Sequence, residues 1–142
     1  MFIGEYKHSL DDKCRVIIPS KYRSLLGESF ILTKGLDGCL FIYTLEEWKQ
    51  FEQKLKALPI TNTNARKFVR FFLAGAAECT MDKQGRILIP SNLVVYSCIE
   101  KDIVFIGMSN RIEVWSSSKW DDYNEQEFDA NSLAEQMEEL GI

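Results

Sequence analysis

Two copies of one short pattern hold the residues of this 142-residue sequence that are best suited to binding chemistry. Residues 10–20 read LDDKCRVIIPS and residues 81–91 read MDKQGRILIPS, so an Asp precedes an Arg by four positions in each copy. An Asp side chain can hydrogen-bond the backbone two residues further on. An Arg presents a planar fork of donors that matches the O6 and N7 atoms of guanine. The pattern therefore indicates two arginines, each held on a turn.

Two interpretations of these D-x-x-x-R turns stay open at this stage. In the first, each Asp caps its own turn and pairs with the Arg, because exposed ion pairs of this kind usually serve local structure. In the second, the Asp holds the turn while the Arg and its neighbours project outward to DNA. The candidate DNA-binding residues are Lys13, Arg15, Lys83, Gln84 and Arg86, and the residues expected to structure the turns are Asp11, Asp82 and Gly85.

The middle of the turn differs between the copies. Gly85 would let the backbone approach DNA closely because glycine has no side chain, whereas Cys14 takes its place in the first copy. Lys can meet phosphate or guanine, and Gln can pair with adenine. We therefore expect the two turns to contribute unequally to binding, so that Arg15→Ala and Arg86→Ala differ in severity.

Enzymatic and metal-binding patterns are missing from the sequence. It holds one histidine, and the GLDG of residues 35–38 lacks the spacing of a phosphate-binding loop. Its four cysteines show no C-x-x-C spacing, which argues against structural zinc and against a disulfide framework. We expect no enzymatic activity, no metal, no cofactor and no small-molecule substrate.

The net charge of −4 conceals an uneven distribution of charge. Residues 116–142 carry one Lys and eight acidic residues, so the preceding residues, with 16 basic and 13 acidic side chains, are net positive. Basic patches suited to nucleic acid therefore remain possible there. No apolar run approaches the roughly 18 residues of a membrane span, and the polar N-terminal stretch does not resemble a signal peptide. We expect a cytoplasmic protein with no membrane partner.

The segments around the turns recur in the same order in each half. CRVIIP and GRILIP each predict a short buried strand that stops at proline, and the following Ser is expected to cap a short helix. A hairpin comes next, and then a helix that carries a Trp, which begins near Thr44 in the first half. The short helices are expected at 20–26 and 91–96, and the hairpin strands at 30–33, 40–43, 103–106 and 112–115.

Repetition at half the chain length indicates a duplicated half-domain. Two such units share one core more readily than they fold separately, because small units bury too little surface. We expect residues 1–75 to form a first repeat with extra helices, residues 76–123 a second repeat, and residues 124–142 an acidic tail. A last helix in that tail would carry a thin apolar stripe of Leu133, Met137 and Leu140.

These features resemble the MraZ family of bacterial transcriptional regulators. The resemblance rests on SLDDKCRVIIPSKYR, on MDKQGRILIPS, on their spacing and on the total length. The family belongs to the AbrB-like group, so the resemblance implies an α+β fold in which two tandem AbrB-like repeats form a double-split, swapped-hairpin β-barrel with flanking helices. Cys14 departs from the family's D-x-K-G-R pattern, whereas Asp11 and Arg15 match it.

The resemblance also implies a function. MraZ proteins bind double-stranded DNA at short direct repeats in the promoter of the division and cell-wall gene cluster, using the Arg of each D-x-x-x-R turn. They assemble into homo-oligomeric rings and would associate with the nucleoid. An alternative class stays open, because AbrB-like domains also occur in antitoxins. In that case the stripe of Leu133, Met137 and Leu140 would bind the neutralised partner.

Overall fold

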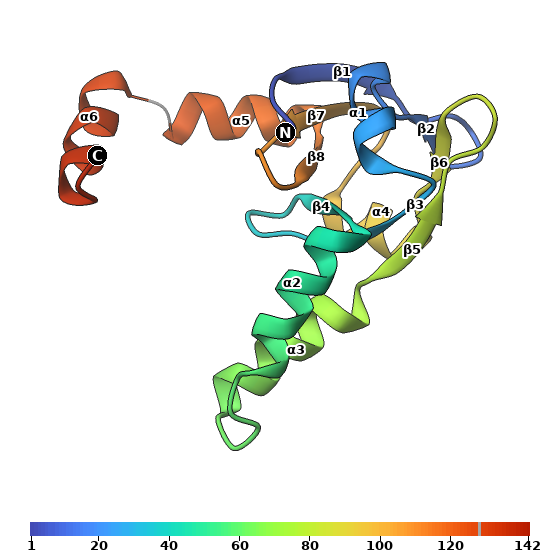
Figure 1. The fold of residues 1–142 in the computed structure, drawn as a ribbon. Helices are drawn as coiled ribbons and strands as arrows, with labels where there is room; N and C mark the ends of the chain where they lie inside the picture. Colours follow the sequence, from blue (N-terminus) through green and yellow to red (C-terminus); the bar gives the residue numbers. More distant parts are fainter. Residues whose placement is uncertain (128) are drawn as a thin grey trace.

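The computed structural model describes residues 1–127 and 129–142, and Figure 1 shows how their elements are arranged, with α2 and α3 projecting together from the strands. The strands are β1 (Glu5–Ser9), β2 (Arg15–Ile17), β3 (Ser29–Lys34), β4 (Leu40–Thr44), β5 (Ala77–Thr80), β6 (Arg86–Leu88), β7 (Asp102–Gly107) and β8 (Ile112–Ser116). The helices are α1 (Ser20–Leu26), α2 (Leu45–Lys56), α3 (Thr63–Ala74), α4 (Ser91–Ser97), α5 (Ser117–Glu127) and α6 (Ala130–Glu139).

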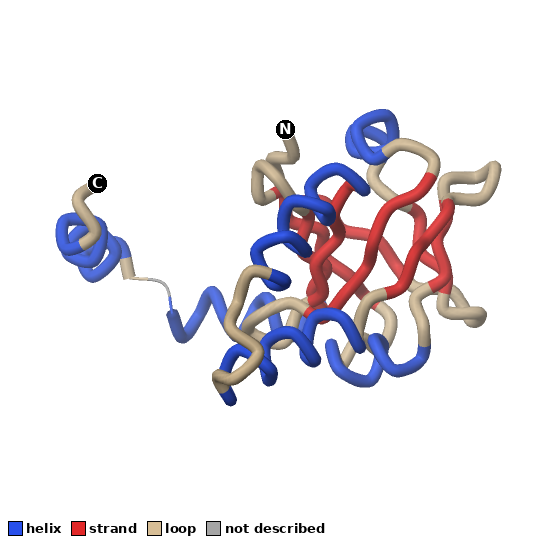
Figure 2. Tube along the Cα trace, turned by 60° about the horizontal axis from the view of Figure 1, so that its bottom comes forward, coloured by secondary structure: helices blue, strands red, loops and turns tan. Residues whose placement is uncertain are grey.

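Six of the strands form one antiparallel sheet in the order β1-β7-β8-β4-β3-β5 (strands red in Figure 2). Each half supplies a hairpin, β3–β4 or β7–β8, and the two hairpins join where β4 pairs with β8. The edges cross between the halves, because β1 of the first half pairs with β7 and β5 of the second half pairs with β3. The two halves are therefore interleaved within one sheet.

Strands β2 and β6 form a separate two-stranded antiparallel ribbon, with one strand from each half. Its inward side chains, Val16 and Ile87, join the first buried cluster, which also contains Phe30 and Ile42 of the sheet and Tyr22 of α1. One face of the sheet is thus covered by the ribbon together with α1 and α4. Burial of this shared apolar surface holds the halves together.

The expected double-split barrel is found only in part. The α+β class and the exchange of strands between halves are present. The strand pairs, however, describe an open six-stranded sheet with β1 and β5 at its edges, plus the separate ribbon. Within residues 1–127 and 129–142, no recorded pairing closes these two sheets into a barrel.

The opposite face of the sheet packs against the longer helices through two matching aromatic triplets. In the first half, Tyr43 stacks on Phe51 with ring centroids 5.4 Å apart, and Trp48 contacts both rings. The second half has a triplet at the equivalent positions, but there the stacked pair is Trp120 and Tyr123, with ring centroids 5.8 Å apart. Such pairs contribute about 0.5–1.5 kcal/mol beyond their buried area. The second triplet consists of Trp115, Trp120 and Tyr123.

The helix starts agree with the sequence for α2 but not for the two short helices. Thr44 accepts a hydrogen bond from the backbone N–H of Glu47 at 3.1 Å, as expected of an N-cap. In α1 and α4 the N-cap position is the proline itself, and Ser20 and Ser91 are already helical. The expected serine caps are therefore wrong, because the extended ψ at the proline places the cap one residue earlier.

No helix among the described residues combines the length and the apolarity needed to cross a membrane. In that same part of the chain, no group of three or more His, Cys, Asp or Glu side chains is placed to hold a metal ion. The four cysteines carry free thiols, at Cys14, Cys39, Cys79 and Cys98.

Candidate nucleic-acid interface

The first D-x-x-x-R turn is organised around one carboxylate. The backbone N–H groups of Lys13 and Arg15 both donate to Oδ1 of Asp11 at 2.9 Å, and Nε of Arg15 donates to Oδ2 at 2.8 Å. The backbone closes the same turn, because the N–H of Asp11 donates to the carbonyl of Arg15 at 2.8 Å. Asp11 therefore fixes both the backbone of the turn and the direction of the arginine side chain.

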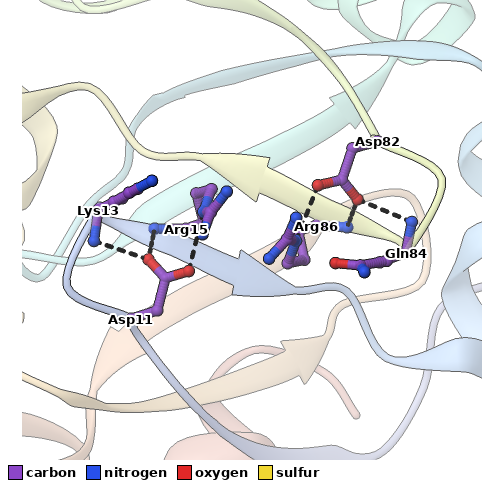
Figure 3. A network of polar contacts seen from close by, with 6 residues as sticks. All are labelled: Asp11, Lys13, Arg15, Asp82, Gln84 and Arg86. Atoms are coloured by element: carbon purple, nitrogen blue, oxygen red, sulfur yellow. Dashed lines mark hydrogen bonds and ion pairs between the residues drawn. The ribbon is translucent and has the colours of Figure 1, made fainter.

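The second turn has the same geometry. The N–H groups of Gln84 and Arg86 donate to Oδ1 of Asp82 at 2.9 Å, and Nε of Arg86 donates to Oδ2 at 2.8 Å. Figure 3 shows that the two arginines lie near the middle of the ribbon, while Lys13 and Gln84 lie toward its opposite ends. The fold thus places the two arginines between Lys13 and Gln84.

Pairing with the aspartate leaves part of each arginine side chain exposed. Each arginine pairs with its aspartate through Nε, yet the side chains of Arg15 and Arg86 remain 32% and 27% exposed. Among the described residues, no hydrogen bond is recorded from the Nη groups of either side chain. An arginine held along its Nε edge still offers its two terminal nitrogens to a planar acceptor pair.

The hydrogen bonds also keep the two carboxylates ionised. The backbone N–H of Arg15 is the main cause that holds the pKa of Asp11 below its usual value, and the Arg15 side chain and the Lys13 N–H lower it further. The same groups of Arg86 and Gln84 lower the pKa of Asp82. Both turns therefore keep their ion pairs at neutral pH.

Cys14 adopts the conformation that glycine has in the second turn. Its φ is +60°, and the φ of Gly85 is +79°. A non-glycine residue in this region carries a cost of about 1–2 kcal/mol, and the hydrogen bonds around Asp11 hold Cys14 there. The departure from the glycine pattern thus leaves the shape of the turn unchanged.

Arg23 is a basic residue of this site that sequence reasoning missed. Its Nε donates to the carbonyl of Ile18 at 2.9 Å, and a Cβ on Gly85 would lie 2.7 Å from its Cζ. The residue 71 positions further on is Val94, so the first turn has no equivalent cation. The two turns therefore share their geometry but differ in their surroundings. Comparison of the two copies could not reveal a residue that occurs in only one of them.

The outer face of the ribbon is defined by strand register. Arg15 lies opposite Leu88 and Arg86 lies opposite Ile17, so these four side chains share one face. The expectation that both strands are buried is correct only for alternate residues. Val16 is buried, whereas Ile17 is 42% and Leu88 is 60% exposed. The ribbon thus presents two arginines and two aliphatic side chains together. A period-2 reading of the apolar run would have found the two aliphatic residues.

The remaining candidate residues lie on the turns that flank this face. Lys13, Lys83 and Gln84 are exposed, whereas Gly85 is buried beneath Arg23. A two-stranded ribbon fits the major groove of B-DNA, where an Arg can make a bidentate contact with a guanine. The arrangement is therefore suited to reading base edges from the ribbon and to contacting the DNA backbone from the turns.

Comparison with known proteins connects this geometry to a family. The family described as "MraZ protein, putative antitoxin-like" matches residues 1–71 and matches a second time at residues 72–140. The chain belongs to the MraZ family. The two matched segments each contain one D-x-x-x-R turn, so the duplication seen in the sequence is a duplication of the MraZ unit.

Close relatives within the MraZ family extend over the whole chain. A protein of Clostridium acetobutylicum named "Transcriptional regulator MraZ" is 63% identical over the full length of both chains. Proteins of the same name from Clostridium tetani and Acetivibrio thermocellus are 62% and 61% identical, again over the full length of both chains.

Proposed function

We propose that this chain is a transcriptional regulator that binds double-stranded promoter DNA in a sequence-specific manner. The observation that carries the proposal is the pair of equivalent Asp–Arg turns, which present two guanidinium groups on one face of a ribbon (Figure 3). Bidentate pairing of Arg with guanine is the commonest specific contact in the major groove. The name shared by the relatives, "Transcriptional regulator MraZ", supports the regulatory part.

Each candidate residue has a role in this proposal. Arg15 and Arg86 read guanines through their Nη groups, and the aspartates hold them in position through Nε. An arginine that is held before binding loses less side-chain entropy when it meets DNA. The three exposed turn residues contact phosphates or flanking bases. They are Lys13, Lys83 and Gln84.

The proposal extends to assembly and to the target. A homo-oligomeric ring would place one ribbon from each subunit on successive short direct repeats, about 10 base pairs apart, in the promoter of the division and cell-wall gene cluster. A single chain of net charge −4 has little general attraction for DNA. Engagement of several repeats at once would supply affinity through effective concentration.

Binding to the DNA upstream of the protein's own gene tests this function. Fluorescence anisotropy would compare the wild type with Arg15→Ala and Arg86→Ala, and with Arg70→Ala as an exposed arginine control on α3. Each ribbon variant should weaken specific binding by about 1–3 kcal/mol, and the control should bind like the wild type. Unchanged binding in both ribbon variants would refute the assignment of these arginines.

A second candidate function is neutralisation of a protein partner. It is favoured by the apolar stripe of α6, where Leu133, Met137 and Leu140 are 46%, 40% and 79% exposed, and by the antitoxin-like description of the family. Copurification of a small protein at fixed stoichiometry, lost in a Leu133→Asp and Met137→Asp double variant, would support this function. Retained DNA binding by that double variant would separate the two functions.

A further inference from the structure

Two aliphatic side chains lie exposed at the centre of the candidate DNA-binding face. Ile17 and Leu88 are 42% and 60% exposed, although the preceding residue in each strand faces the core and is buried. They occupy equivalent positions in the two copies of the repeat. The repeat thus keeps an aliphatic side chain at the same outward position in both strands.

We propose that Ile17 and Leu88 are specificity-determining residues that pack against the C5-methyl groups of thymines, beside the guanines read by the arginines. This inference rests on the proposed function, because it places the outer face of the ribbon in the major groove. The thymine methyl is the apolar group that this groove presents, and aliphatic side chains recognise it by direct contact.

Strand register places each aliphatic side chain next to both arginines. Ile17 lies directly opposite Arg86 and two residues along the strand from Arg15. Leu88 has the mirror arrangement, opposite Arg15 and two residues from Arg86. Directly opposite residues have Cβ atoms about 4.5–5.5 Å apart, and bases rise by about 3.4 Å per step along a strand. A methyl contact therefore falls within one or two base steps of the guanine that the neighbouring arginine reads.

The chemistry of the face favours thymine over cytosine. At the place of the thymine methyl, cytosine presents only the hydrogen on C5, and its N4 amino group stands where thymine has the O4 acceptor. An aliphatic side chain at this place would lose its apolar contact when thymine is replaced by cytosine. Ile17 and Leu88 would therefore favour a thymine over a cytosine beside the guanine.

The charge of the face favours DNA over a second copy of the chain as the occupant. Arg15 and Arg86 flank the two aliphatic residues on the same surface. Each arginine is paired with its aspartate through Nε, and its terminal nitrogens, with the exposed Lys13 and Lys83, still offer donors that suit the negatively charged DNA backbone. A symmetric contact between two such ribbons would face these donors with donors of the same kind and offer them no acceptor.

Replacement of thymine by deoxyuridine tests the inference, because it removes only the methyl group. In a duplex from the upstream region, each thymine beside a guanine would be replaced in turn and binding measured by fluorescence anisotropy. We expect about fourfold weaker binding by the wild type for each contacted methyl. Ile17→Ala or Leu88→Ala should no longer distinguish thymine from uracil at the contacted position, as a double-mutant cycle would show.

Leu36→Ala provides the matched control, because Leu36 is 58% exposed and lies away from the ribbon in the turn between β3 and β4. It should retain the full preference for thymine. Equal binding of thymine and uracil duplexes by the wild type would overturn the inference, as would a preference that persists in both ribbon variants. A change of oligomer mass in these variants, without any thymine preference in the wild type, would instead assign the two residues to a subunit contact. Failure of the wild type to bind the upstream DNA at all would refute the proposed function itself.

Discussion

At the residue scale, one carboxylate in each turn decides where a guanidinium group points. Asp11 accepts two backbone hydrogen bonds and one from the Arg15 side chain, and Asp82 does the same for Arg86. Exposed ion pairs contribute little to stability on their own. The value of these contacts lies in orientation, because they fix the Nε edge of the arginine and leave its terminal nitrogens accessible.

Acid titration should reveal the contribution of these carboxylates to folding. Their pKa values are lowered in the native state, so the native protein binds fewer protons than the unfolded chain. The resulting stability is fully present above the usual carboxyl pKa and is lost as the pH falls through the lowered values. An Asp11→Asn and Asp82→Asn double variant should therefore be less stable at neutral pH, and its free energy of unfolding should fall less steeply as the pH is lowered. Urea denaturation across the acid range measures this. A fall as steep as that of the wild type would contradict this assignment.

Gly85→Ala should destabilise the protein through two separate effects. The φ of +79° disfavours any side chain, and the new Cβ would lie 2.7 Å from the guanidinium of Arg23. Moving that group away would break its hydrogen bond to the carbonyl of Ile18. We expect a loss of about 1–3 kcal/mol in the free energy of unfolding.

Arg23→Ala supplies the control for this substitution. In the Arg23→Ala background the new Cβ no longer meets a guanidinium group. Gly85→Ala should then lower the free energy of unfolding only by the cost of the positive φ, about 1–2 kcal/mol. Urea denaturation of the four proteins forms a double-mutant cycle. Strictly additive losses would show that the guanidinium does not press on residue 85.

At the element scale, the ribbon links the candidate DNA-binding face to the core. An isolated two-stranded ribbon is only marginally stable, so its inward residues must anchor it. Val16 and Ile87 face each other within the first buried cluster. The pairing also continues past the strands, because the N–H of Ile18 donates to the carbonyl of Gly85 at 2.8 Å and that of Ile89 to the carbonyl of Cys14 at 2.9 Å.

Substitutions on the two faces of the ribbon should differ in their effect on stability. Ile87 is 2% exposed, so Ile87→Ala should lower the free energy of unfolding by about 2–4 kcal/mol through lost contacts and a cavity. Ile17→Ala on the outer face should change it by less than about 0.5 kcal/mol. Chemical denaturation measures both, and equal losses for the two variants would contradict the described orientation of the ribbon.

The sequence predicted those elements whose patterns are local. Both hairpins, the two short helices after the prolines and the helix after Thr44 lie where the repeat and the apolar spacing indicated. Strands β1 and β5 were missed, because Glu5–Ser9 and Ala77–Thr80 show no distinctive apolar pattern and are strands only through partners in the other half. Pairing between distant segments is the part of the fold that a linear pattern does not contain.

The candidate site was predictable to a similar degree. The D-x-x-x-R pattern located both turns and anticipated the pairing of Asp11 with Arg15 and of Asp82 with Arg86. The contact between Arg23 and Gly85 could not be predicted, since it joins two halves that meet only in the folded chain.

At the scale of the whole molecule, duplication and interleaving bring two equivalent turns onto one face of the ribbon. The ribbon takes one strand from each half, so neither half alone presents both arginines. The turns have the same geometry, but Arg23 accompanies only the second. The unequal effects of Arg15→Ala and Arg86→Ala, expected from the sequence, therefore stay a prediction, and the structure supplies a physical reason for them.

We propose that the outer face of the ribbon reads guanines from the major groove. Dimethyl sulfate methylates N7 of guanine in the major groove and N3 of adenine in the minor groove, so methylation interference on the upstream DNA tests this claim. We predict that methylation of guanine N7 in each repeat blocks binding of the wild type, and that Arg15→Ala and Arg86→Ala each become insensitive to methylation of a different guanine. Interference confined to adenines, or a guanine pattern that both variants leave unchanged, would contradict the claim.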